Sequence, residues 1–287
     1  MKKLKVDEVI CIVIFSDVHA EARRLQEFLD FTKTWNFEEQ YGKVDHYVCL
    51  GDVLDRGHQP KATLNILKGL KELRWVRGNH DEAAQMRVSV CSQDELATAA
   101  HAQLIRDGGA DFVDELPDYI VDATYKYFAV HGGPVDPSSL APQMLHPDIV
   151  WLSQRTWQRI STYTGFDGSG YHVSPETAFR HASKYFHGDG WMVLAGHDHN
   201  EGCYTWDRDK VRDIMPVISR RDNVVHTKIA GYNVSEKHIK IDDKKDYILR
   251  IGALGAERPG YYGVIKIDGD RREFIFARMR KVGELSP

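Results

Sequence analysis

The stretch ICIVIFSDVH, residues 10–19, decides the fold class because it joins a buried strand to a polar cluster. Its first part, Ile10 to Phe15, is a continuous apolar run rich in β-branched residues, which is typical of a strand buried on both faces. Ser16-Asp17-Val18-His19 follows directly. Residues 21–35 then carry apolar side chains at a helical spacing. The predicted order is therefore strand, polar loop, helix.

The same order recurs further along the chain. A second short strand over 47–50 ends at Gly51-Asp52, and Pro60 opens another helix, since proline suits the first helical turn. A third strand, Trp75-Val76, ends at Gly78-Asn79-His80-Asp81. This repetition predicts an α/β sheet with helices on its faces. Ligands of such sheets bind beyond the carboxyl ends of the strands, which is where these polar clusters fall.

The second half of the chain has a different pattern. Strands are predicted over 126–131 and 191–195, and the region between them, 134–190, is rich in aromatic and loop residues. We interpret 134–190 as a partly helical insertion or cap. Strands are expected to dominate after it, with a hairpin over 264–279 that turns at Asp268-Gly269. The prediction is one domain, residues 1–287, with this insertion.

Length and composition are those of an ordinary globular protein. The 287 residues can bury a sizeable core, and hydrophobic residues make up 42% of them. The net charge of −4 does not indicate a basic surface for stable nucleic-acid binding. No segment approaches the roughly 18 apolar residues of a membrane span. The cysteines lack metal-site spacing and fit a reducing compartment as free thiols, so a cytoplasmic location is expected: Cys11, Cys49, Cys91 and Cys203.

Five polar clusters each lie just after a predicted strand. They are Asp17-x-His19, Gly51-Asp52-x-x-Asp55-Arg56, Gly78-Asn79-His80-Asp81, His131-Gly132 and Gly196-His197-x-His199. Carboxylate and amide oxygens mixed with imidazoles suit manganese, iron or zinc better than calcium. No cysteine takes part, which argues against a structural zinc site.

These clusters resemble the pattern of the calcineurin-like metallophosphoesterase family. That pattern is D-x-H, G-D-x-x-D, G-N-H-D/E, a lone H and then G-H-x-H, and every element is present in order between Asp17 and His199. The resemblance implies a four-layer α/β sandwich, in which two mixed β-sheets pack face to face between helices. It also implies a phosphoesterase with two divalent metal ions, Mn²⁺ first, with Fe or Zn as alternatives.

The resemblance implies a role for each residue of the clusters. A hydroxide held between the two ions would attack phosphorus in line. Seven residues would hold the ions: Asp17, His19 and His199 on one, Asn79, His131 and His197 on the other, and Asp52 bridging both.

Four residues would support catalysis without holding a metal. His80 would lie near the leaving group, where it would stabilise the transition state or protonate the departing oxygen. Asp81 would orient His80, and Asp55 would fix a histidine ligand from behind. Arg56 would contact a phosphate oxygen, since its planar fork matches that geometry, although a surface ion pair is the alternative.

Further substrate contacts are expected near this set. His58 follows Arg56-Gly57, and the insertion contributes Trp151, Arg155 and His172. Aromatic residues of the insertion either stack on a nucleobase or simply form the core of the insertion.

The motifs resemble two branches of the family, which imply different substrates. Residues 51–57, GDVLDRG, and 77–80, RGNH, look like the protein-phosphatase and diadenosine-tetraphosphatase branch. The two histidines of 196–199 and the closing segment 251–264 are similar to small prokaryotic phosphodiesterases, although 251–253 lacks their proline and serine. The expected substrates are small phosphodiesters or phosphomonoesters, namely nucleotides or dinucleoside polyphosphates. A serine/threonine phosphoprotein phosphatase is the alternative, a non-catalytic interaction scaffold the second. The sequence leaves open whether the protein forms a homodimer.

Overall fold

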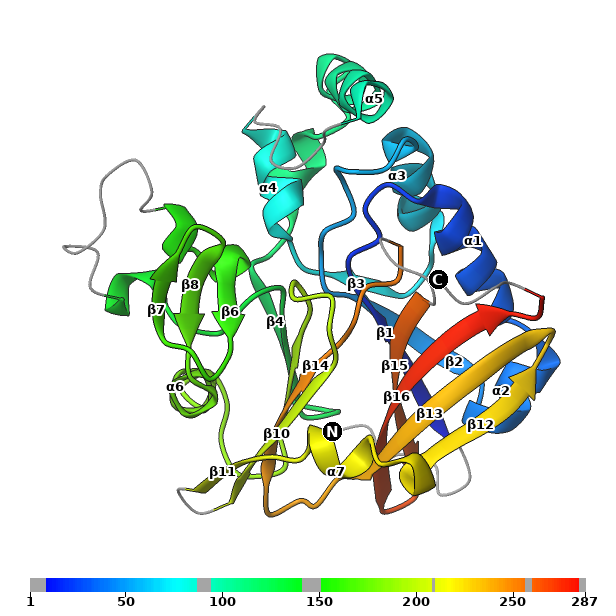
Figure 1. Cartoon of the computed structure of the whole chain (residues 1–287), viewed down its shortest axis with the longest axis vertical. Coiled ribbons are helices and arrows are strands. Elements are labelled where there is room, and N and C mark those ends of the chain that lie inside the picture. The colour runs from blue at the N-terminus through cyan, green and yellow to red at the C-terminus, as the bar shows by residue number, and fades with distance from the viewer. Residues whose placement is uncertain (1–8, 87–93, 141–150, 208–209, 256–259, 284–287) are drawn as a thin grey trace.

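The computed structural model describes the chain except for residues 1–8, 87–93, 141–150, 208–209, 256–259 and 284–287. Two large sheets lie face to face, with helices on the outer side of each (Figure 1). Sheet A has the strand order β12-β13-β16-β15-β1-β2-β3. Its strands span, in that order, Val224–Ile229, Tyr232–Lys240, Arg271–Lys281, Gly260–Asp268, Ile10–Phe15, Val44–Cys49 and Leu73–Trp75.

Sheet B has the strand order β11-β10-β14-β9-β5-β4. Its strands span Lys210–Asp213, Gly202–Asp207, Asp246–Arg250, Met192–Ala195, Tyr127–Val130 and Tyr119–Asp122. A small third sheet, sheet C, has the order β6-β8-β7, and its strands span Gln158–Ile160, Gly170–Val173 and Gly165–Asp167.

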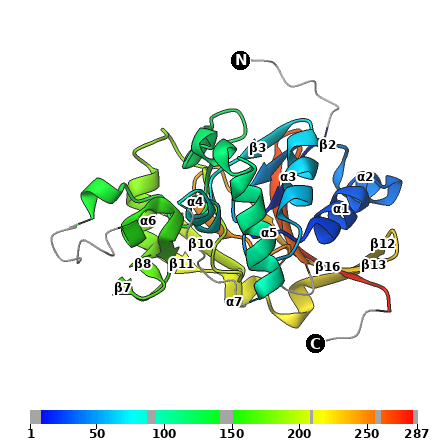
Figure 2. The same cartoon turned by 90° about the horizontal axis from the view of Figure 1, so that it is seen from above.

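Helices cover the outer faces of both sheets. Figure 2 shows α1 (Ala22–Phe31), α2 (Trp35–Tyr41) and α3 (Pro60–Gly69) together at one side of the molecule, with α6 (Pro175–Ala182) at the other. Between them, α4 (Asn79–Gln85) and α5 (Glu95–Arg106) lie over the site edge of the sheets. Short helices also occur in the described chain, among them α7 (Met215–Ile218), η1 (Asp111–Glu115), η2 (Pro137–Ser139), η5 (Arg155–Trp157) and η6 (Arg221–Asn223).

Strand β1 explains why two sheets can sandwich one another. Its side chains alternate between the two faces of sheet A. Cys11, Val13 and Phe15 pack in the core beneath α1 to α3, whereas Ile12 and Ile14 pack between the two sheets. A third core lies between sheet B and α6. The continuous apolar run therefore serves two cores, and the structure confirms the predicted four-layer sandwich.

The topology brings the loops of the motifs to one edge. β1, β2 and β3 are parallel neighbours, and in sheet B β14, β9 and β5 are also parallel. The carboxyl ends of these strands meet at the same edge of the sandwich. The segments directly after β1, β2, β3, β5 and β9 carry all of the predicted metal ligands, with Asn79 as the first residue of α4.

The helix predicted over 21–35 ends earlier, at Phe31, and a second helix, α2, begins at Trp35. Thr34 takes an extended conformation, with φ −73° and ψ 148°, and its side chain accepts a hydrogen bond from the N–H of Phe37. A threonine oxygen that satisfies a free N–H at a helix start is a typical N-cap. Apolar spacing alone cannot reveal such a break, because both helices bury one face on the same sheet.

Two further predictions need correction in detail. The 134–190 insertion contains α6, but it also forms sheet C, whose strands of three or four residues are too short to show a periodicity. The predicted hairpin is present, but its turn lies one residue later, at 269–270, since Asp268 pairs with Arg271. Gly269 supplies the positive φ of 59° that the turn requires.

Other expectations concern the thiols and membranes. Cys11, Cys49 and Cys203 are buried and free, while Cys91 lies outside the described residues. None of the described helices is long and apolar enough to cross a membrane.

Candidate metal centre

The loops that carry the motifs have strained backbones. Positive φ values, between 49° and 70°, occur at five residues of these loops: Asp17, His19, Asp52, His197 and His199. This region is sparsely populated by residues with a side chain, and each instance costs on the order of 1–3 kcal/mol. Backbone hydrogen bonds between the loops hold the conformation, from the N–H of Asp17 to Gly51 O at 3.0 Å and of His19 to Asp52 O at 2.9 Å.

Glycines in the motifs let these loops touch. A Cβ atom on Gly78 would lie 2.1 Å from the backbone nitrogen of Asp52 and 2.2 Å from its Oδ1. A Cβ on Gly196 would lie 2.0 Å from Ser16 Oγ. Both distances are far below van der Waals contact. The glycines before Asn79 and His197 are therefore needed for the close approach of neighbouring strand ends.

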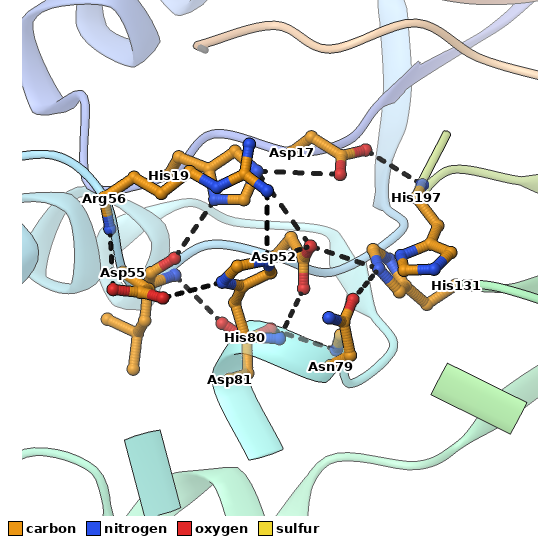
Figure 3. A network of polar contacts seen from close by, with 12 residues as sticks. Asp17, His19, Asp52, Asp55, Arg56, Asn79, His80, Asp81, His131 and His197 are labelled. Atoms are coloured by element: carbon orange, nitrogen blue, oxygen red, sulfur yellow. Dashed lines mark hydrogen bonds and ion pairs between the residues drawn. The ribbon is translucent and has the colours of Figure 1, made fainter. Parts of the chain in front are cut away.

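The side chains from these loops converge on one buried centre (Figure 3). Around Asp52, the Nε2 atom of His131 lies 3.2 Å from Asp52 Oδ2 and 2.9 Å from Asn79 Oδ1. Around Asp17, the Nε2 atom of His199 lies 3.3 Å from Asp17 Oδ1. Potential ligand atoms within 4.8 Å of one another form three groups: Asp17, His19 and His199; His19, Asp52 and His80; and Asp52, His131 and His197.

Two of the histidines, His131 and His19, are oriented as metal ligands are. The Nδ1 atom of His131 lies 2.6 Å from Leu50 O, and that of His19 lies 3.4 Å from Leu54 O. A ring whose Nδ1–H donates to a carbonyl turns the lone pair of Nε2 to the centre, which is the usual arrangement behind a metal-bound histidine. His197 Nε2 is buried and has no hydrogen-bond partner among the described residues.

Electrostatics favour cations at this centre. Burial lowers the pKa of His19 to about 3 and that of His197 well below its ordinary value, so both are neutral donors. Burial opposes ionisation of Asp52, yet the neighbouring His131 and His80 hold the pKa of this carboxyl well below its usual range. Burial opposes a charge on His131, yet the Asp52 carboxylate raises the pKa of His131 to about 9, so the buried carboxylates draw positive charge into this centre. Divalent metal ions fit this donor set.

His80 lies at the side of this centre. Its Nδ1 atom lies 2.7 Å from Asp55 Oδ2, and its Nε2 atom lies 3.9 Å from Asp52 Oδ2 and 3.3 Å from Arg56 Nη2. Asp55 therefore orients His80 (Figure 3). The sequence predicted instead that Asp55 would fix a histidine that binds a metal. Arg56 lies beside His80 through this contact, and its predicted phosphate contact stays a prediction.

Asp81 has a different role from the predicted one. Its Oδ1 accepts hydrogen bonds from the N–H groups of Val53 and Leu54, both at 2.9 Å, and its Oδ2 accepts one from Gly78 at 3.0 Å. The prediction that Asp81 orients His80 is wrong, because this carboxylate is committed to backbone donors. Burial, followed by the charge of Asp52, raises the pKa of Asp81 to about 6. Asp81 shapes the loop that presents Asp52.

Two of the predicted substrate contacts are wrong, because both side chains are held elsewhere. Arg155 is buried, and it donates to Pro134 O at 3.1 Å and to Tyr185 Oη at 2.5 Å. His172 pairs with Asp167 at 3.0 Å within sheet C. These contacts hold the insertion together.

The other two predicted contacts, His58 and Trp151, remain at the surface. His58 is half exposed and pairs with Asp94, the N-cap of α5, at 2.8 Å. Trp151 is 38% exposed and packs edge to face on Trp157, with ring centroids 4.5 Å apart. The Trp157 ring in turn lies 6.4 Å from that of His197. The insertion therefore reaches the edge of the metal centre through Trp157.

Sequence reasoning missed an ion-pair cluster in the G-H-x-H motif. Asp198, the variable position, pairs with Arg159 at 2.5 Å and with Arg250 at 2.7 Å. These partners come from β6 and β14, so the cluster ties the insertion and sheet B to the loop of His197 and His199. It also missed His101 on α5. No sequence pattern marks the ion-pair cluster or His101, because the residues that contact one another are far apart along the chain.

The chain belongs to the calcineurin-like phosphoesterase family, whose model matches residues 11–201. It is accordingly a metal-dependent phosphoesterase, a hydrolase. The family uses divalent metals, and the Asp and His clusters described above could bind them. No curated protein matches the chain.

Solved structures share the fold at low sequence identity. A metallophosphoesterase from Sphaerobacter thermophilus superposes with a TM-score of 0.58 at 18% identity, over 96% of this chain and 90% of that one. A hypothetical protein from Pyrococcus horikoshii OT3 gives a TM-score of 0.55 at 12% identity, over 93% and 86%. A protein serine/threonine phosphatase from Saccharomyces cerevisiae gives 0.50 at 14%, over 96% and 81%. At these identities the likeness shows the fold alone.

Proposed function

We propose that the protein hydrolyses phosphoester bonds of nucleotides or dinucleoside polyphosphates, with two divalent cations, Mn²⁺ first. The convergence of imidazoles on Asp17 and Asp52, with Nδ1 of His131 and of His19 each facing a backbone carbonyl, supports this proposal best. The seven side chains named from the sequence would hold the cations, with Asp52 shared. When bound, such cations polarise a phosphoryl oxygen and lower the pKa of a water to near neutrality.

Two residues beside the cation ligands would act on the substrate, and a third would orient one of them. Arg56 would bind a non-bridging phosphate oxygen. His80, which is oriented by Asp55, would hold a proton at Nε2 and donate it to the departing oxygen. Because Nδ1 of His80 contacts the Asp55 carboxylate, the orientation of the ring is fixed.

The position of the insertion favours a small substrate over a protein substrate. We propose that residues 134–190 act as a cap, since Thr156 donates to Glu82 on α4 at 2.7 Å and Trp157 lies beside His197. A nucleobase stacked on Trp151 would extend the Trp151–Trp157 pair away from the centre. Base stacking on an aromatic side chain is worth roughly 1–3 kcal/mol.

A substrate panel with Mn²⁺ tests this proposal. We expect faster hydrolysis of mononucleotides or dinucleoside polyphosphates than of phosphoserine and phosphothreonine peptides. Trp151→Ala should raise KM for the nucleotide about tenfold, whereas KM for bis-p-nitrophenyl phosphate should stay unchanged. Preference for the phosphopeptides would favour the phosphoprotein-phosphatase alternative. Absence of metal binding and of any hydrolysis would favour the interaction scaffold.

A further inference from the structure

The loop after β2, residues 52–57, has an unusual backbone that must be held from outside. Asp55 and Arg56 follow one another in the left-handed region, each with φ 66°. Two consecutive residues of this kind persist only where their surroundings fix them. Buried N–H groups of such a loop also need acceptors.

The N–H groups from Val53 to Gly57 have identified acceptors. Those of Val53 and Leu54 bind Asp81 Oδ1, as described above. That of Arg56 binds Asp55 Oδ1 at 2.8 Å. The N–H of Asp55 itself donates to Nε2 of His101, at 2.7 Å. His101 is therefore the contact through which α5 fixes the residue that orients His80.

The geometry also fixes the tautomer of His101. Its Nδ1 atom lies 2.8 Å from Ala97 O, one helical turn earlier in α5. A carbonyl can only accept, so Nδ1 carries the hydrogen and Nε2 offers a lone pair to Asp55. The side chain is 8% exposed, and burial lowers its pKa, which keeps the acceptor form. A second contact, from His58 to Asp94, joins the residue directly after this loop to the start of α5.

We propose that His101 is a positioning residue for His80, and that it acts through the backbone of Asp55. The chain of contacts is continuous: His101 Nε2 accepts from the N–H of Asp55, whose Oδ2 holds Nδ1 of His80 at 2.7 Å. A shift of the Asp55 backbone would move this carboxylate and rotate the His80 ring. Metal binding would be spared, because His101 touches none of the seven proposed ligands. This inference rests on the catalytic role proposed for His80.

Two substitutions that differ by one methylene group separate this role from mere packing. In His101→Gln, the amide oxygen can reach the former position of Nε2 and accept from Asp55. In His101→Asn, the amide ends near the former position of Nδ1 and cannot reach it. With Mn²⁺ and bis-p-nitrophenyl phosphate, we expect kcat to fall about tenfold in His101→Asn, since one oriented contact is lost, and to stay within about twofold in His101→Gln.

Metal affinity and a second buried histidine serve as controls. Mn²⁺ affinity, measured by calorimetry, should be unchanged in both variants. His46 is also buried, and it bonds to Tyr127 Oη at 3.2 Å on β5. His46→Asn should lower the melting temperature without lowering kcat. A loss of Mn²⁺ affinity in His101→Asn, or equal kcat values for the Asn and Gln variants, would overturn the positioning role.

A double-mutant cycle provides the decisive readout. If His101 acts through His80, then His101→Asn should have no further effect on kcat in a His80→Ala background. An equal tenfold loss in both backgrounds would overturn the inference while leaving the role of His80 intact. A wild-type kcat in His80→Ala alone would instead overturn the role of His80 itself, and with it the inference.

Discussion

Asp52 is the residue on which the metal centre most depends. It comes within 3.2 Å of His131 and 4.0 Å of His19, and its other oxygen accepts the N–H of His80 at 2.8 Å. Asp52→Asn keeps the shape and removes the charge. We expect more than about a hundredfold loss of kcat and weaker binding of both metals, since even partners behind the ligands are worth roughly 10–100-fold in affinity. Metal content by mass spectrometry checks this, and retention of two ions would contradict it.

His80 should behave differently from the ligands, because its ring is held by Asp55 at the side of the centre. We predict that His80→Ala lowers kcat by roughly 10²–10⁴-fold, the usual worth of a general acid. Metal content should remain at the wild-type level. Steady-state kinetics beside metal analysis distinguish the two roles, and loss of a metal in this variant would place His80 among the ligands.

At the scale of elements, the insertion is anchored by Arg155. Besides its two hydrogen bonds, the guanidinium lies over the rings of Tyr119 and Tyr185, 5.0 and 5.2 Å from their centroids. Arg155→Met should lower the free energy of unfolding by about 1–3 kcal/mol, because buried acceptors lose their donor. Urea denaturation measures this loss, with the exposed Arg23→Met as control. A raised KM at unchanged stability would restore Arg155 as a substrate contact.

At the scale of the whole molecule, an ion pair links the edges of the two sheets. Arg74 on β3 pairs with Asp122 on β4, and Arg77 pairs with Asp118 beside it at 2.5 Å. Burial alone would raise the pKa of Asp122, but the hydrogen bond and charge of Arg74, together with the N–H groups of Tyr125 and Thr124, outweigh it and hold this pKa below its usual value. A depressed carboxyl pKa stabilises the fold above the unfolded pKa of about 4, and this stability is lost as pH falls through the folded pKa.

Asp122→Asn should therefore lower the free energy of unfolding at neutral pH but not in acid. We expect a loss of about 1 kcal/mol at pH 7, a small value because Arg74 is partly exposed. The difference from wild type should vanish near pH 2. Urea titrations at both pH values check this, with the exposed Glu39→Gln as the matched control. An equal loss at both values would mean that shape, rather than charge, is what this position contributes.

Much of this protein could be predicted from its sequence. Apolar runs followed at once by Asp, Asn or His predict strands with ligands at their carboxyl ends, and the order of the five clusters indicates the family. These are local signals, since strand propensity, glycine and ligand type all lie within a few residues of one another. Asp17, Asp52 and His131 can therefore be named as candidate metal ligands from the sequence alone.

Only the tertiary structure decided which supporting residue serves which ligand. Asp55, rather than Asp81, holds His80, and His101 accepts from the loop although it lies 46 residues beyond it. Arg155, a plausible substrate contact by composition, is buried in the insertion. Such pairings depend on how separate strands and helices pack, and a hydrogen bond acts over about 3 Å in space whatever the distance along the chain. The sequence names the donors and acceptors, while the packing selects the pairs.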